Sequence, residues 1–185
     1  MRTESRTVRR SWVKHHKRRN YAVLGIVTAL LVVVIIAISA IPAPAVVRVG
    51  QLAPDFTLPD INNGNFHLYG HRGRPVLIEF MTTSCPACTL QAPILSELWS
   101  QHGVHADFIS ITIDPARDQP STLSAYAQQH NMPWTWAIDQ RQVMQTYGVT
   151  ATPTIFILDS DGVVKNHFVG VQDLQTLENS LLALL

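Results

Sequence analysis

The two cysteines of the chain, Cys85 and Cys88, are separated by two residues and stand where an apolar run gives way to a helical pattern. The residues before them predict a buried strand over 75–82, and the apolar spacing after them predicts a helix over 86–101. A strand that leads directly into a helix is typical of alternating α/β packing. Cys85 is therefore expected at the N-terminal end of the helix.

That position has chemical consequences for the two thiols. The first backbone N–H groups of a helix are unpaired and lie at the positive end of the helix dipole, so they stabilise an anion. As the N-cap, Cys85 could accept hydrogen bonds from Ala87 and Cys88, which lowers the pKa of its thiol. Pro86 suits the first helical position. Cys88, one turn further on, is placed to attack a mixed disulfide formed on Cys85.

Two structural roles for the cysteine pair compete with redox chemistry. A disulfide between residues this close in sequence closes almost no loop and stabilises little. A zinc site of four cysteines needs a second pair, and the chain has two cysteines in all. The spacing next to a strand–helix unit therefore favours a redox-active pair.

The remaining segments predict an α/β domain. Strands alternate with helices first, and a hairpin and a helix follow, which indicates a central mixed sheet with helices on both faces. The expected further elements are a hairpin of 56–58 and 66–69, a strand over 108–113, a helix over 120–130, a strand over 135–138, a helix over 140–147, a hairpin of 154–158 and 163–169, and a helix over 173–184.

The N-terminal part predicts a membrane anchor. Residues 21–41 are 21 consecutive positions without a charge, which as a helix would be about 31 Å long and would span a bilayer core of about 30 Å. Basic residues precede it, so the N-terminus is expected in the cytoplasm. We expect a basic cytoplasmic tail at 1–20, a transmembrane signal-anchor helix at 21–41, a Pro/Ala linker at 42–48 and an extracytoplasmic domain at 49–185.

A cleaved export signal is the alternative interpretation of this segment. The small residues at 43–45 suggest a cleavage site, and Arg9 and Arg10 begin a run that loosely resembles a twin-arginine signal. The apolar run is longer than the 7–15 residues of an ordinary signal peptide, which favours the anchor. The sequence leaves the choice open.

The net charge changes sign between the N-terminal segment and the predicted domain. Residues 1–47 carry a net charge of +7 and residues 48–185 a net charge of −6. An acidic exported domain is a poor nucleic-acid binder, so none is expected as a partner. A cysteine pair outside the cytoplasm works where disulfides persist, so it needs exported protein thiols or disulfides as clients and a membrane or extracytoplasmic partner for electrons.

With these features, residues 49–185 resemble the thioredoxin superfamily, and within it the membrane-anchored TlpA-like and redoxin-type thiol-disulfide oxidoreductases. The segment 49–58 is similar to the start of these families. Cys85 and Cys88 match their attacking and resolving cysteines, which form a disulfide in the oxidised state. Pro93 matches the proline that kinks their active-site helix. The resemblance implies a thioredoxin-like fold and no bound cofactor or metal.

The resemblance also implies roles for residues outside the cysteine pair. Pro153 matches a proline that follows a cis peptide bond and faces the disulfide. Thr152 would then present its backbone beside Cys85 to a substrate strand, with Pro86 as a further substrate contact. Whether the protein reduces or oxidises its clients is left open.

Glu79 lies six residues before Cys85, where thioredoxins place a buried acid that assists proton transfer to the resolving cysteine. A carboxyl group buried within an apolar strand has a raised pKa, which suits a general acid and base. The alternative is that Glu79 points to solvent from an edge strand.

Two other functions remain as alternatives. The segment 114–118 and the helix after it resemble Sco-type copper chaperones, whose cysteines are spaced by three residues, and two thiolates with one imidazole suit copper. A thiol peroxidase is less favoured because Ile78 stands where peroxiredoxins carry a proline, although Thr82 matches their threonine. The candidate third copper ligands are His67, His71, His102, His105, His130 and His167.

Overall fold

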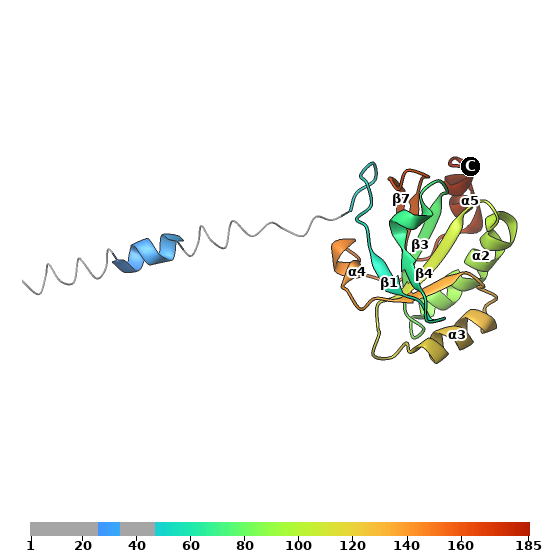
Figure 1. Cartoon of the computed structure of the whole chain (residues 1–185), viewed down its shortest axis with the longest axis horizontal. Coiled ribbons are helices and arrows are strands. Elements are labelled where there is room, and N and C mark those ends of the chain that lie inside the picture. The colour runs from blue at the N-terminus through green and yellow to red at the C-terminus, as the bar shows by residue number, and fades with distance from the viewer. Residues whose placement is uncertain (1–25, 34–46) are drawn as a thin grey trace, which may run out of the picture. The chain divides into compact units, whose positions relative to one another are not determined.

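The computed structural model describes residues 26–33 and 47–185 (Figure 1), which belong to two separate units. Residues 26–33 are helical. Within these described ranges, no helix combines the length and the apolar character needed to cross a membrane. The predicted tail at 1–20, most of the predicted anchor at 21–41 and most of the linker at 42–48 lie outside the described residues.

The C-terminal unit contains seven strands and four α-helices among its described residues, in the order that the sequence predicts. They are β1 (Thr57–Pro59), β2 (Asn65–His67), the 3-10 helix η1 (Leu68–His71), β3 (Val76–Met81), α2 (Pro86–His102), β4 (Asp107–Thr112), α3 (Pro120–Gln129), β5 (Thr135–Ile138), α4 (Val143–Thr146), β6 (Thr154–Leu158), β7 (Val164–Val169) and α5 (Leu174–Leu182).

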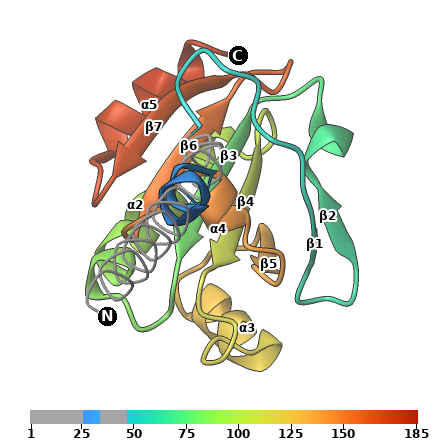
Figure 2. The same cartoon turned by 90° about the vertical axis from the view of Figure 1, so that its left-hand side faces the viewer.

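Five strands form the central sheet in the order β5-β4-β3-β6-β7, which Figure 2 shows across its width. β3, β4 and β5 are parallel, whereas β6 runs antiparallel to β3 and to β7. β1 and β2 form a separate antiparallel hairpin. The predicted mixed sheet and the predicted hairpins are therefore confirmed.

The sheet is covered on both faces (Figure 1), with α2 and α5 on one side and α4 on the other. Side chains from α2, α3 and α5 pack in one apolar cluster, and those from α4 and the β1–β2 hairpin pack in a second. Alternation along β3 sends Ile78 and Phe80 to the second cluster and Leu77 and Met81 to the first. Glu79 therefore shares the face of the sheet that α2 covers.

The helix predicted over 140–147 is shorter in the structure, where α4 spans Val143–Thr146. Its start is set by Asp139, whose carboxylate accepts the backbone N–H groups of Val143 and Met144, each at 2.8 Å. An acidic side chain that binds these N–H groups caps the helix from four residues upstream. Residues 140–142, between Asp139 and the helix, are therefore not helical.

Candidate active site

Cys85 lies at the N-terminal end of α2, as the sequence predicts. Its backbone is extended, Pro86 is the first helical residue, and the Cys85 sulfur accepts the backbone N–H of Cys88 at 3.1 Å. Cys85 is partly exposed, whereas Cys88 is 1% exposed and belongs to the core beneath α2. Both are free thiols, so the structure describes the dithiol state of the predicted couple.

The two thiols differ in acidity because of these positions. Burial raises the pKa of Cys85, but hydrogen bonds from the Cys88 and Thr152 side chains and from the N–H groups of Cys88 and Ala87 outweigh it and leave the pKa below its ordinary value. Burial raises the pKa of Cys88 to about 12, and the Cys85 thiol and the charge of Glu79 act in the same direction. Cys85 is thus the thiol that ionises first.

A second segment approaches Cys85 from the far end of the chain. The Thr152–Pro153 peptide bond is cis, as the resemblance implies. The Cys85 sulfur lies 3.5 Å from the carbonyl oxygen of Thr152. The carbonyl of Pro153 accepts the N–H of Gly170 at 2.8 Å, which joins this loop to the end of β7. The loop and the cysteine pair therefore form one surface.

Glu79 is buried beneath this surface, with 1% of its area exposed, so the alternative that it points to solvent is wrong. Its Oε2 accepts the hydroxyl of Ser110 at 2.6 Å, and its Oε1 has no hydrogen-bond partner among the residues that the structure describes. Burial raises the pKa of Glu79 from 4.5 to about 7, although the Ser110 hydrogen bond lowers it in part. A carboxyl group that titrates near neutrality suits proton transfer.

Asp118 anchors the turn that precedes Cys85, a role that the sequence did not predict. Its fully buried carboxylate accepts the backbone N–H of Thr83 at 3.1 Å, the hydroxyl of Thr83, and the hydroxyl of Thr112 at 2.5 Å. Burial raises the pKa of Asp118, but these hydrogen bonds dominate and hold it below its usual value. The available signal in the sequence was the presence of Thr83 and Thr112 near the ends of two predicted strands, since their hydroxyls need a hydrogen-bond acceptor when buried.

We expect Asp118→Ala to destabilise the protein on the order of 2–4 kcal/mol at pH 7, because the three donors lose their buried acceptor. Because the pKa of Asp118 is lower in the folded than in the unfolded protein, its ionised carboxylate stabilises the fold. This stabilisation is fully present above the unfolded pKa and is lost as the pH falls through the folded pKa. Urea unfolding at pH 7 and at acidic pH measures both effects. The exposed Asp161→Ala is the matched control, and an equal loss in both variants at pH 7 contradicts the assignment.

Gln91 is a second buried polar residue that the sequence left without a role. Its Oε1 accepts the N–H of Gln172 at 2.7 Å, and its Nε2 donates to the carbonyl of Gln172 at 3.3 Å. These two bonds join the first turns of α2 to the loop before α5. A polar residue on the apolar side of the predicted helix, in line with Leu95 and Leu98, was the available signal.

The predicted copper ligands are not gathered around the cysteines. Within residues 26–33 and 47–185, no group of three His, Cys, Asp or Glu side chains is placed to hold a metal ion. Several of these histidines have other partners. His67 binds Asp55, His71 binds Asp107, His102 binds Glu178, and the ring of His167 stacks on Phe156.

Comparison with known proteins agrees with this geometry. The chain is 26% identical over 135 residues to the thioredoxin-like protein YneN of Bacillus subtilis, covering 73% of this chain and 79% of that one. It is 28% identical over 135 residues to the thiol-disulfide oxidoreductase ResA of Bacillus thuringiensis, covering 72% and 77%. A crystal structure from Chlorobium tepidum, described as a thiol:disulfide interchange protein DsbE, superposes with a TM-score of 0.66 at 26% identity, covering 74% of this chain and 97% of that one.

The fold and the dithiol at the start of α2 define a thioredoxin-like protein of the thiol-disulfide oxidoreductase class. Residues 49–167 match the model of the AhpC/TSA family, which is more than half of the chain. The chain belongs to the AhpC/TSA family.

Proposed function

We propose that this protein is a membrane-anchored oxidoreductase that exchanges the Cys85–Cys88 couple with thiols and disulfides of exported proteins. The observation that carries the proposal is the contrast between the two cysteines. Cys85 is accessible and its pKa is lowered by hydrogen bonds at the end of a helix, whereas Cys88 is buried with a raised pKa. This contrast suits an attacking and a resolving thiol.

In the reductive direction, the Cys85 thiolate attacks one sulfur of a client disulfide. A bond forms between Cys85 and that sulfur, and the other client sulfur leaves as a thiolate. The Cys88 thiol then loses its proton and attacks the Cys85 sulfur. The internal disulfide forms and the client departs as a dithiol, so two electrons pass from the protein to the client. Oxidation of a client follows the same steps in reverse.

Glu79 is the proton acceptor that we propose for the second step. Cys88 cannot ionise readily at neutral pH because its pKa is raised to about 12. Glu79 lies close enough for its charge to affect the Cys88 thiol, and its own pKa of about 7 lets it take up a proton near neutrality. A proton acceptor for Cys88 therefore speeds its attack on the Cys85 sulfur and shortens the lifetime of the mixed disulfide.

The surface around Cys85 supports a docking site for an extended client segment. The Thr152 carbonyl lies 3.5 Å from the Cys85 sulfur, and Pro86, the residue after that cysteine, is exposed. We propose that the Thr152 backbone hydrogen-bonds to the client chain and that Pro86 packs against it. Pro153 is buried beneath this loop and supports Thr152.

Trapping of the mixed disulfide tests the mechanism. In Cys88→Ser the first attack is retained and the resolving step is lost, so a client with one disulfide is expected to remain bound to Cys85. Non-reducing mass spectrometry detects the covalent adduct, and Cys85→Ser is the matched control. Equal adduct formation on both variants contradicts the assignment of Cys85 as the attacking thiol.

We further propose that residues 1–20 are a cytoplasmic tail, that 21–41 anchor the chain in the membrane, and that 42–48 are a linker. The domain 49–185 then acts outside the cytoplasm and receives electrons from, or passes them to, a membrane or extracytoplasmic partner. The uncharged run behind a basic segment supports this topology. A C-terminal reporter enzyme that is active only outside the cytoplasm is expected to be active and to sediment with membranes. A soluble or inactive fusion contradicts the topology.

A further inference from the structure

Glu79 stands at the end of a chain of hydrogen bonds that begins at Trp134. The indole N–H of Trp134, immediately before β5, donates to the Ser110 Oγ at 2.9 Å. Ser110 in β4 donates in turn to the Glu79 Oε2 at 2.6 Å. Ser110 and Glu79 face each other in the register of the parallel pair β3 and β4. The backbone pairing therefore brings the last two side chains of the chain together.

The direction of this hydrogen-bond chain is set by its first member. An indole N–H can only donate, and a serine hydroxyl has a single proton. Because the Ser110 Oγ accepts from Trp134, its own proton is directed toward the carboxylate of Glu79. Two donors in line polarise each other and strengthen the bond to the ionised acceptor.

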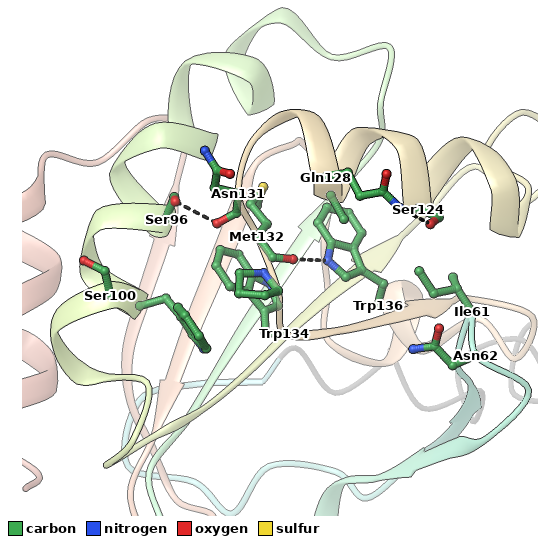
Figure 3. Close-up of a pocket in the computed structure, with 13 residues that line it drawn as sticks. Ile61, Asn62, Ser96, Ser100, Ser124, Gln128, Asn131, Met132, Trp134 and Trp136 are labelled. Carbon is green, nitrogen blue, oxygen red and sulfur yellow. Dashed lines mark hydrogen bonds between the residues drawn. The ribbon is translucent and has the colours of Figure 1, made fainter.

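The Trp134 ring is held in place by other aromatic side chains. It lies in the wall of a cavity of about 580 Å³ (Figure 3), together with Trp99 and Trp136. The ring centroids of Phe108 and Trp99 are 5.5 and 6.3 Å from that of Trp134. The N–H of Trp136 is bonded elsewhere, to the carbonyl of Met132 at 3.0 Å. The hydrogen bond to Ser110 thus belongs to Trp134 and not to its aromatic neighbours.

The two oxygens of Glu79 consequently have different surroundings. The Oε2 is held by Ser110, whereas the Oε1 is buried and has no hydrogen-bond partner among the described residues. Glu79 lies on β3 between Leu77 and Met81, which pack in the same apolar cluster as Cys88, and its charge raises the pKa of the Cys88 thiol. Of the two oxygens, the Oε1 is therefore the one left free to exchange a proton.

We propose that Trp134 and Ser110 are positioning residues of the dithiol site, which hold Glu79 by its Oε2, leave its Oε1 to exchange the proton of Cys88, and determine the pH at which Glu79 ionises. The functional part of this inference rests on the proposed thiol-disulfide exchange. Trp134 and Ser110 act through Glu79 and do not touch the client.

Removal of either donor is expected to raise the pH at which Glu79 ionises, because both stabilise its charged form. Ser110→Ala removes a hydrogen bond to a charged group, which corresponds to a rise of about 1 pH unit. Trp134→Phe keeps the ring and removes only the N–H, so a smaller rise in the same direction is expected. Because Trp134 acts through Ser110, the double variant should match Ser110→Ala alone.

The test is a carbon NMR titration of the reduced full-length protein labelled at the glutamate carboxyl carbons. The chain has four glutamates, Glu4, Glu79, Glu97 and Glu178, and Glu79→Gln identifies the Glu79 signal. Ser110→Thr retains a hydroxyl and should restore the wild-type midpoint. Trp99→Phe removes another indole N–H from the same cavity and should leave the midpoint unchanged.

An unchanged midpoint in Ser110→Ala, or equal shifts in Trp134→Phe and Trp99→Phe, overturns the inference. Additive shifts in the double variant also contradict it, because they show that Trp134 acts by another route. The rate of mixed-disulfide resolution is then measured against pH, and its midpoint should move with that of Glu79. If the carboxyl shifts occur but no variant, wild type included, exchanges disulfides, the proposed function fails while the hydrogen-bond chain stands.

Discussion

Cys85→Ser is expected to reduce disulfide exchange to the uncatalysed rate. A serine hydroxyl at this position cannot form a disulfide with a client, and the remaining thiol is 1% exposed with a raised pKa. Cys88 therefore has neither the access nor the ionisation needed to replace the lost nucleophile. The rate at which the full-length protein reduces a client with one disulfide, in the presence of excess dithiol, measures the effect.

Two matched variants make this result specific. Ser84→Ala changes the exposed neighbour of Cys85 and should leave the exchange rate close to that of the wild type. Cys88→Ser should still react once with the client and then stop. Substantial turnover by Cys85→Ser would show that the helix-terminal thiol is not the nucleophile.

Glu79→Gln is expected to slow the resolving step and, at the same time, to stabilise the fold above neutral pH. Burial raises the pKa of Glu79 from 4.5 to about 7, so folding favours its protonated form. As the pH rises from 4.5 to about 7, ionisation of Glu79 therefore destabilises the native state progressively. The loss of stability reaches about 3 kcal/mol once the pH exceeds the folded pKa. A neutral amide avoids that cost. Loss of a general base should slow resolution on the order of 10²-fold.

The pH dependence separates this explanation from a general packing effect. Urea unfolding should show Glu79→Gln as more stable than the wild type at pH 8, with the advantage vanishing toward pH 4.5. Glu97→Gln replaces an exposed glutamate of α2 and should change neither stability nor rate. A Glu79→Gln variant that is less stable at pH 8, or that resolves mixed disulfides as fast as the wild type, contradicts the proposed role.

The elements of the domain could be predicted because local patterns and packing agree along most of the chain. The apolar run before Cys85 and the helical spacing after it placed β3 and α2 to within about one residue of their observed ends. The N-cap position of Cys85 followed from the same junction. The cis bond before Pro153 was predicted by family resemblance alone, because the residues themselves are equally compatible with an ordinary turn.

The parts of the site that were missed depend on contacts between segments far apart in sequence. Asp118 reaches Thr83 across 35 residues, and Trp134 reaches Ser110 across 24. Neither pair shows a local spacing that signals a hydrogen bond. A tryptophan is expected to pack by its ring, and no sequence pattern indicates the acceptor of its N–H. Glu79 lies opposite Ser110 because of the register in which the parallel strands β3 and β4 pair. No sequence pattern specifies that register.

The redox equilibrium of the full-length protein against glutathione tests the central claim most directly, with the state of both cysteines read by mass. We expect one reversible two-electron couple confined to Cys85 and Cys88, with a potential between about −270 mV, typical of a reductant, and about −120 mV, typical of an oxidant. A protein that stays fully reduced at every glutathione ratio, or a glutathione adduct on Cys85 that never converts to the internal disulfide, would contradict the account.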